Sequence, residues 1–407
     1  MSGSGRAGGA SLADDERSAR AHLSRVVEPG DVTLPRLLGE HGWRGCVRRL
    51  VDGRAPEVWQ ERHDRLDVAT SDLLATASRQ GIRVVVPGDP SWPAGLYDLD
   101  EWSAAPACLW VRGELPGADR APVAVALVGA RACTAYGQHV AEDIAAGLVE
   151  HGWTVVSGAA YGIDAAAHRG AVAAASGGGD PASGLPTVAV LAGGVDRASP
   201  AGHERLLGAV LDAGGAVVAE VPPGTRPAPH RFLLRNRLIA AWSRATVVVE
   251  AGHRSGALST VRSAVALGRD VGAVPGPVTS GLSAGCNALL RESVPCIRDA
   301  ADVVGLVEPW SQQSLDLAEH VVAVPPADGV PVQSRRDEDA REGSERVLQA
   351  LRRTAWRDVG ALVVATGLPA RDVAVALGRL ELAGLVERSQ GRWRRGAAVG
   401  AGDGVVP

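Results

Sequence analysis

Short apolar runs rich in valine alternate with alanine-rich stretches through the middle of the chain, from residue 82 to residue 305. The apolar runs predict strands at Val123–Val128, Thr154–Val156, Thr187–Leu191, Ala216–Ala219, Thr246–Val249 and Val271–Val274. The intervening stretches predict helices at Gln138–Glu150, Ile163–Ala175, His203–Asp212, Arg235–Trp242 and Gly256–Leu267. Strands that are apolar along their whole length are typical of parallel sheets that helices cover on both faces. Residues 82–305 therefore predict a doubly wound, mostly parallel α/β domain.

The regions that flank this domain have different patterns. Residues 14–81 predict a helical, SAM-like N-terminal domain with helices at Ala19–Val27, Leu34–His41, Val47–Val51 and Asp67–Gln80. Residues 306–343 contain prolines and a run of charged residues, which is typical of a linker. Residues 1–13 and 397–407 are expected to be disordered tails.

Residues 344–396 form a compact pattern of three helices followed by a hairpin. The third helix starts at Pro369 and places Val373, Leu377 and Leu380 on one face, and a short hairpin follows around residues 389–391. Ten arginines and five acidic residues give this segment a local charge of +5. The pattern predicts a winged-helix domain, in which the arginines either hold phosphates or form a solvated face.

Lysine is absent from the chain, so all 42 basic residues are arginine. A Walker A loop, a Schiff-base enzyme and a protein kinase each require a lysine, so the sequence excludes these three classes. The five cysteines are widely spaced and predict neither a disulfide framework nor a zinc site. The N-terminus does not resemble a signal peptide, and no apolar stretch approaches the roughly 20 residues of a membrane span. We therefore expect a cytoplasmic protein with no membrane segment, no metal and no cofactor.

Small residues follow the predicted strands. In an open parallel sheet, ligands bind where strands end and helices begin, and helix N-termini at that edge favour anions. Any one glycine there can simply form a tight turn, but five such loops on one edge, together with an arginine, predict an anion site. The candidate residues at these positions are Gly129, Ala130, Arg131, Ser157, Gly158, Gly162, Gly193, Gly194, Ser255, Gly256 and Asn287.

The densest basic stretch spans residues 230–237 and opens a predicted helix. Its arginines Arg235 and Arg237 are suited to bidentate contacts with phosphates. Asn236 can donate a hydrogen bond, and Phe232, the only phenylalanine in the chain, can stack on a base. The alternative is a solvated helix start with Phe232 in the core. Asparagine occurs only twice in the chain, and both asparagines lie at the predicted edge, which favours a binding role.

Three other kinds of site have weaker support. A dinucleotide-binding G-x-G-x-x-G motif is absent, because Arg131 occupies its second glycine position, so NAD is not expected. Residues 281–285 spell the G-x-S-x-G string of serine hydrolases, but Pro275-Gly276-Pro277 stands where a strand should precede it. Asp164 and His168 share a helix face, yet no further histidine or carboxylate joins them. We interpret this pair as a helix N-terminal acid and a structural histidine.

Taken together and in this order, these motifs resemble those of the DNA-processing protein A (DprA/Smf) family over residues 82–305, and the predicted winged helix agrees with that family. The resemblance implies an extended Rossmann-like domain that binds single-stranded DNA and forms homodimers. It further implies a non-enzymatic recombination mediator that loads RecA onto incoming strands during natural transformation, past single-strand-binding protein. The series is Val128-Gly129-Ala130-Arg131, Ser157-Gly158 to Ile163-Asp164 with His168, Ala192-Gly193-Gly194-Val195-Asp196, Phe232 with Arg235-Asn236-Arg237, Glu250 with Ser255-Gly256, Pro275-Gly276 and Gly285-Cys286-Asn287.

The sequence departs from the family pattern at three places. Tyr161 stands where many members have arginine, Ala198-Ser199-Pro200 stands where Tyr-Pro is common, and Cys286 replaces a usual threonine. Two other functions remain open at this point. One is a nucleotide phosphoribohydrolase of the LOG type, whose Pro-Gly-Gly-x-Gly-Thr-x-x-Glu run is missing at residues 275–279. The other is a transcription regulator that uses the winged helix on duplex DNA.

Overall fold

The computed structural model describes residues 15–102, 105–177, 184–308, 344–351, 357, 359–368, 373, 376–378, 380, 385–389 and 392–395. The described residues up to 308 form one compact unit, and those from 344 onward form a second. The predicted tails and nearly all of the predicted linker, residues 309–343, lie outside the described residues.

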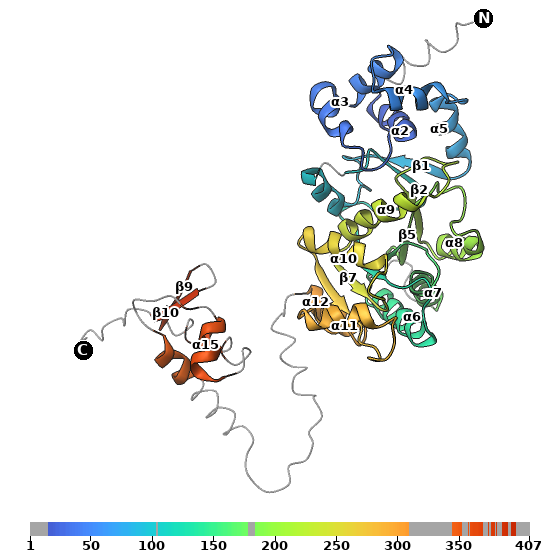
Figure 1. Cartoon of the computed structure of the whole chain (residues 1–407). Helices are drawn as coiled ribbons and strands as arrows, with labels where there is room; N and C mark the ends of the chain where they lie inside the picture. Colours follow the sequence, from blue (N-terminus) through green and yellow to red (C-terminus); the bar gives the residue numbers. More distant parts are fainter. Residues whose placement is uncertain are drawn as a thin grey trace, which may run out of the picture. The chain divides into compact units, whose positions relative to one another are not determined.

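An eight-stranded sheet organises the first unit (Figure 1). Its strand order is β1-β2-β6-β5-β4-β3-β7-β8. All pairs from β6 to β8 are parallel, which confirms the predicted mostly parallel sheet. The six predicted strands match observed strands to within one residue at each end. The strands are β1 (Ile82–Val85), β2 (Leu109–Gly113), β3 (Ala124–Val128), β4 (Thr154–Ser157), β5 (Thr187–Leu191), β6 (Ala216–Ala219), β7 (Ala245–Val248) and β8 (Asp270–Ala273).

The strands β1 and β2 were not predicted. They pair with each other and with β6 in antiparallel register, so that Val85 lies opposite Leu109 and Trp110 lies opposite Ala219. The 3-10 helix η1 (Ala94–Trp102) lies between them in the chain, where a parallel pair would need a crossover α-helix. A pattern of alternating strands and helices in the sequence therefore does not predict β1 and β2.

Helices cover both faces of the sheet, as the apolar strands require (Figure 1). In β3, Val125 and Leu127 face α6 and α7, whereas Ala126 and Val128 face α9 and α10, because successive side chains of a strand point to opposite faces. None of the described helices is long and apolar enough to cross a membrane. The helices are α6 (Ala135–Glu150), α7 (Ile163–Ser176), η3 (Ala201–His203), α8 (Glu204–Asp212), α9 (Pro229–Trp242), α10 (Ala257–Ala266), α11 (Ala284–Arg291) and α12 (Ala300–Val307).

The helix α9 begins six residues earlier than the sequence predicted. Pro229 occupies its first turn, where the missing N–H of proline costs no hydrogen bond. The basic stretch therefore lies inside the helix, and Phe232 belongs to its first turn. The side chains near the start of α9 consequently project toward the edge where the strands end.

The N-terminal helices pack around the buried side chains of Leu23, Leu50 and Trp59. The element α3 consists of two helical segments, as predicted, separated at Gly42, whose φ of 64° and ψ of 175° are not helical. The helix α4 was not predicted. The observed helices are α2 (Glu16–Val26), α3 (Thr33–Val51), α4 (Glu57–Asp64) and α5 (Thr70–Arg79).

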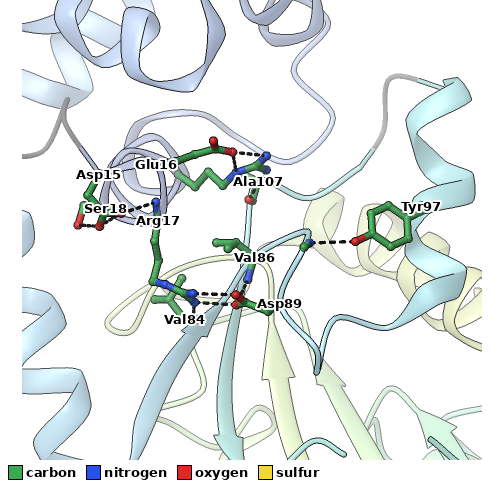
Figure 2. Close-up of polar contacts among 11 residues, drawn as sticks. Asp15, Glu16, Arg17, Ser18, Val84, Val86, Asp89, Tyr97 and Ala107 are labelled. Atoms are coloured by element: carbon green, nitrogen blue, oxygen red, sulfur yellow. Dashed lines mark hydrogen bonds and ion pairs between the residues drawn. The ribbon is translucent and has the colours of Figure 1, made fainter. Parts of the chain in front are cut away.

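The helix α2 is attached to the antiparallel edge of the sheet by two arginines (Figure 2). Arg17 pairs with both carboxylate oxygens of Asp89 at 2.6 and 2.7 Å and donates to the carbonyl of Val84 at 2.8 Å. Arg20 donates to the carbonyl of Ala107 at 3.0 Å. The helical region therefore belongs to the same compact unit as the sheet.

The second unit contains the winged-helix domain that the sequence predicted. Helix α15 (Val359–Thr366) and the antiparallel strands β9 (Val386–Ser389) and β10 (Arg392–Arg395) are its named elements. Val373, Leu377 and Leu380 are buried, as expected for the core face of the third helix, of which only part lies among the described residues.

Candidate nucleic-acid interface

A pocket of about 510 Å³ opens at the carboxyl ends of the central strands. Its walls come from the loop after β3 (residues 128–132), one face of α9, and residues 252–257 at the start of α10. The volume lies within the range of pockets that bind small ligands. Eight predicted site residues line it: Gly129, Ala130, Arg131, Phe232, Arg235, Asn236, Ser255 and Gly256.

The mouth of the pocket carries an exposed arginine and a half-buried aromatic ring. The guanidinium carbon of Arg131 lies 4.8 Å from the ring centroid of Phe232, which is a cation–π contact. Arg131 makes no ion pair or side-chain hydrogen bond within the described part of the chain. The neighbouring side chain of Leu233 is 58% exposed. Positive charge, a ring face and apolar surface therefore meet at one accessible place.

Arg254 is a second exposed arginine on the same pocket, and the sequence analysis did not select it. No ion pair or hydrogen bond of its side chain is found among the residues that the structure describes. It precedes α10, whose first N–H groups already have partners: those of Ala257, Leu258 and Ser259 donate to Ser255 Oγ, the carbonyl of Ser255 and the carbonyl of Gly256 at 3.3, 3.2 and 3.0 Å. The signal for Arg254 was its position in a loop between a strand and a helix, which is also the position of Arg131.

Arg235 forms the floor of the pocket and is buried. Its Nη1 donates to the carbonyl of Gly158 at 2.7 Å and to that of Val190, and its Nε donates to Asn236 Oδ1 at 3.2 Å. Burial lowers the pKa of Arg235 to about 10. The guanidinium thus holds the ends of β4 and β5 together. Nε and Nη1 of Arg235 are thus bonded within the protein, whereas no hydrogen bond of Nη2 is found among the described residues, so a phosphate contact by this pocket-lining arginine stays a prediction.

Arg237 is also committed to the protein. Its two terminal nitrogens pair with the carboxylate of Glu220 at 2.7 and 2.9 Å, and Nη1 donates to the carbonyl of Leu234 at 2.9 Å. Both side chains of the pair are nearly buried, and Arg237 does not line the pocket. The expectation that Arg237 is a principal phosphate contact is therefore wrong for this conformation, because its donors are already used.

The two asparagines hold loops in place. Asn236 donates to Ser259 Oγ at 2.7 Å and to the carbonyl of Gly256 at 3.4 Å, which orients the start of α10. Asn287 lies outside the pocket and exchanges hydrogen bonds with the backbone of Gly276 at 3.1 and 3.4 Å. Only Asn236 therefore belongs to the pocket.

The other predicted loop residues lie behind the pocket rather than on its surface. Ser157 is buried and donates to the carbonyl of Leu127 at 2.6 Å. Gly158 lies against Arg235, since an added Cβ would come within 2.4 Å of the guanidinium. Gly162 begins α7 with a φ of 80°. The segment after β6, which includes Thr225, covers Gly193 and Gly194. The N–H of Gly194 donates to the carbonyl of Thr225 at 2.9 Å.

Asp164 and His168 are buried in successive turns of α7. Burial raises the pKa of Asp164, and the nearby Arg235 opposes that shift. Thr187 donates its only hydroxyl proton to the carbonyl of Val155 at 2.8 Å, so His168 Nδ1 must donate to Thr187 Oγ1 at 2.7 Å. Burial lowers the pKa of His168 to about 3. Within the described residues, no group of three or more histidine, cysteine or acidic side chains is placed to hold a metal.

Glu250 fixes the loop that carries Arg131. Its buried carboxylate accepts hydrogen bonds from the N–H and hydroxyl of Thr134 at 2.8 and 2.7 Å. Thr134 in turn accepts from the N–H of Gly137 and so caps α6. The backbone carbonyl of Glu250 accepts from the N–H of Ala130 at 2.7 Å. Glu250 therefore serves the loop and does not present its carboxylate to the pocket.

Tyr161 is 51% exposed and lies outside the pocket. Its ring packs edge-on against His203, with 4.6 Å between the centroids.

Comparison with known proteins gives consistent matches. Residues 83–308 match the family model for DNA recombination-mediator protein A, and residues 331–392 match the model for the DprA winged helix domain. A DNA processing protein of the DprA type from Mycobacterium tuberculosis is 41% identical over 94% of this chain and 95% of its own length. DNA processing protein DprA from Streptococcus pneumoniae is 36% identical over 70% of this chain and 93% of its own length. Its solved structure superposes with a TM-score of 0.56 at 30% identity, covering 72% of this chain and 98% of that one.

Proposed function

The chain belongs to the DNA recombination-mediator protein A (DprA/Smf) family, and from this premise we propose that it binds single-stranded DNA at the pocket and loads the recombinase RecA onto it. The observation that carries the proposal is the pairing of Arg131 with Phe232 at the pocket mouth, beside the exposed Arg254. Single-stranded DNA requires both features, since arginines neutralise phosphates and an aromatic face stacks on an unpaired base.

Each part of the site has a distinct task in this proposal. Arg131 and Arg254 hold successive stretches of the phosphate backbone. Phe232 stacks on a base, while Arg131 above the ring limits its freedom. Arg235 and Asn236 keep the surrounding loops in place, so little ordering remains to be done when DNA binds.

The proposal extends to partners and to the absence of catalysis. We propose a homodimer that handles incoming strands with RecA and single-strand-binding protein, in natural transformation or related recombination, in the cytoplasm. Hydrolysis of ATP or of nucleoside monophosphates is not expected, because the chain contains no lysine and the carboxylate of Glu250 already accepts two hydrogen bonds from Thr134. Release of adenine from AMP that disappears in Glu250→Ala would contradict this and assign the enzyme instead.

The deciding experiment is fluorescence anisotropy with labelled single-stranded and duplex oligonucleotides over a series of salt concentrations. The protein should prefer the single strand, and its affinity should fall with salt at a log–log slope of roughly −0.7 per phosphate contact. The double variant Arg131→Ala, Arg254→Ala should lose about two contacts from that slope. Arg205→Ala, which removes an exposed arginine of α8 away from the pocket, is the matched control and should bind as the original chain does. An unchanged slope in the folded double variant would place the DNA elsewhere.

A further inference from the structure

The carboxylate of Glu28 connects the helical N-terminal region to the start of α9, which carries Phe232 of the proposed DNA site. Glu28, two residues beyond the end of α2, pairs with Arg231 in the first turn of α9. Its oxygens accept from Arg231 Nε at 2.9 Å and from Nη2 at 2.6 Å. His230 Nε2 and Arg62 Nη1 lie 3.5 and 3.8 Å from the same carboxylate. Two arginines and a histidine therefore surround one acid.

Close packing accompanies this ion pair. A Cβ added at Gly30 would lie 2.9 Å from Leu234 Cδ2, so the turn after α2 lies directly against α9. The φ of Gly30 is 78°, which an L-residue adopts only with strain. Both an electrostatic and a packing contact thus hold this turn on the start of α9.

The start of α9 needs such support, because its N-cap, Ala228, has no side chain that can cap the helix. Arg231 stabilises this end of the helix by donating hydrogen bonds, which differs from a cap, because a cap accepts them from the helix N–H groups. Its third nitrogen, Nη1, donates to the carbonyl of Arg226 at 2.6 Å, which ties the preceding segment to the helix. Arg231 thus joins the segment before α9, the first turn of α9 and the turn after α2. Phe232 is the next residue in the chain and reaches the pocket mouth.

We propose that Glu28 is a positioning residue of the DNA site: by holding Arg231 it fixes the first turn of α9 and so places the ring of Phe232 beneath Arg131. This inference rests on the proposed function, and it assigns a role in DNA binding to a region that precedes the segment matched by the family model, residues 83–308. The side chain of Arg231 is 17% exposed, so it acts within the protein and does not contact phosphate.

A double-mutant cycle tests the proposal. Glu28→Gln removes the charge at nearly constant size and should weaken binding of a single-stranded oligonucleotide roughly three- to tenfold. The salt slope should stay the same, because no phosphate contact is lost. In a Phe232→Ala background the same substitution should have almost no effect, because the ring that Glu28 positions is absent. Arg231→Gln should reproduce the result of Glu28→Gln, again with the salt slope unchanged.

The matched control is Arg17→Gln. It breaks an equally bidentate ion pair of α2, with Asp89 at the edge of the sheet, that does not involve α9 (Figure 2). It should leave the affinity for DNA unchanged, and thermal unfolding of both variants checks that the fold is retained. A 2-aminopurine base in the oligonucleotide should be less quenched by the Glu28→Gln variant than by the original chain, because base stacking is weakened.

Different failures have different meanings. An equal loss of affinity with and without Phe232 would overturn the positioning role, because Glu28 would then act by another route. Tighter binding with a steeper salt slope in Glu28→Gln would also overturn it, since the freed Arg231 would then be holding a phosphate. No effect of Phe232→Ala by itself would overturn the proposed DNA site, and not only the part played by Glu28.

Discussion

Arginine side chains are found both at the mouth of the pocket and at its floor, and their surroundings differ. At the mouth, Arg131 and Arg254 are exposed and form no ion pair among the described residues. At the floor, Arg235 is buried against backbone carbonyls, and behind it Arg237 pairs with Glu220. A buried guanidinium that donates to backbone carbonyls or to a carboxylate stabilises the fold and has fewer donors left for a ligand. The local density of arginine therefore does not locate a phosphate site; the partners of each arginine do.

The largest effect expected from the difference between the mouth and the floor is on the free energy of unfolding. Arg235→Met should lower the free energy of unfolding by about 3–5 kcal/mol, because it leaves the buried Asp164 without its cation and two carbonyls without a donor. Arg254→Met is the matched control and should change stability by less than about 0.5 kcal/mol. Urea unfolding measures both. Similar losses in the two variants would remove the distinction between floor and mouth.

The next effect concerns affinity. Phe232→Ala should weaken binding of single-stranded DNA by about 1–3 kcal/mol without changing the salt slope, because stacking carries no net charge. Val265→Ala, which shortens an exposed side chain of α10, is the control and should bind normally. Anisotropy titrations at three salt concentrations are sufficient. A shallower slope in Phe232→Ala would mean that the ring acts by orienting Arg131 toward phosphate.

Low pH should act on His168, which is buried behind the pocket, and not on the arginines at its mouth. The folded pKa of His168 is about 3, below its ordinary value of 6.5, because of burial and the nearby His203 and Arg235. Below pH 6.5 the unfolded chain therefore binds the extra proton, and the stability due to His168 falls toward pH 3. Between pH 7 and 5.5 this share should be about 1 kcal/mol. His168→Gln should show a correspondingly flatter dependence of unfolding free energy on pH; an equally steep one would contradict the assignment.

A smaller effect separates the two arginines of the mouth. Arg131→Ala and Arg254→Ala should each make the salt slope shallower by about 0.7, with stability unchanged and all DNA sequences affected alike. If only one of the two variants changes the slope, the DNA backbone passes on one side of the pocket alone.

The smallest effect is expected from the winged helix. A chain that ends near Pro325 should keep most of its affinity for single-stranded DNA. Arg392 and Arg395 are exposed on β10, but Arg394 is paired with Glu387, and no aromatic ring accompanies them at a surface as Phe232 accompanies Arg131 among the described residues. Loss of nearly all affinity would show that exposed arginines suffice without a pocket.

The sequence predicted the central sheet well, because strand burial is a local signal. Each valine-rich run is apolar throughout and is bounded by small residues, so its ends were found to within one residue. The edge strands β1 and β2 were missed because they join the sheet by antiparallel pairing, β1 with β2 and β2 with β6, and β6 lies about a hundred residues further along the chain. Local pattern carries no information on such a partner.

The candidate site was predicted in part for the same reason. Glycine loops and Phe232 were found from their positions after strands and in a basic run. The partners of Arg235 and Arg237 were not, since the carbonyls of Gly158 and Val190 lie far away in sequence and come together only in the folded sheet. Arg254 was missed because it lies outside the basic stretch of residues 230–237. Its side chain is exposed, whereas those of Arg235 and Arg237 in that stretch are buried.

Glu250 sets a limit on how this site can change over evolutionary time. One residue holds the loop after β3 at both ends, through its carbonyl at Ala130 and its carboxylate at Thr134. Substitutions between these two points leave both anchors in place, whereas an insertion or deletion would detach one of them. The identity of the residue at position 131 is therefore free to vary, but the length of the loop is not.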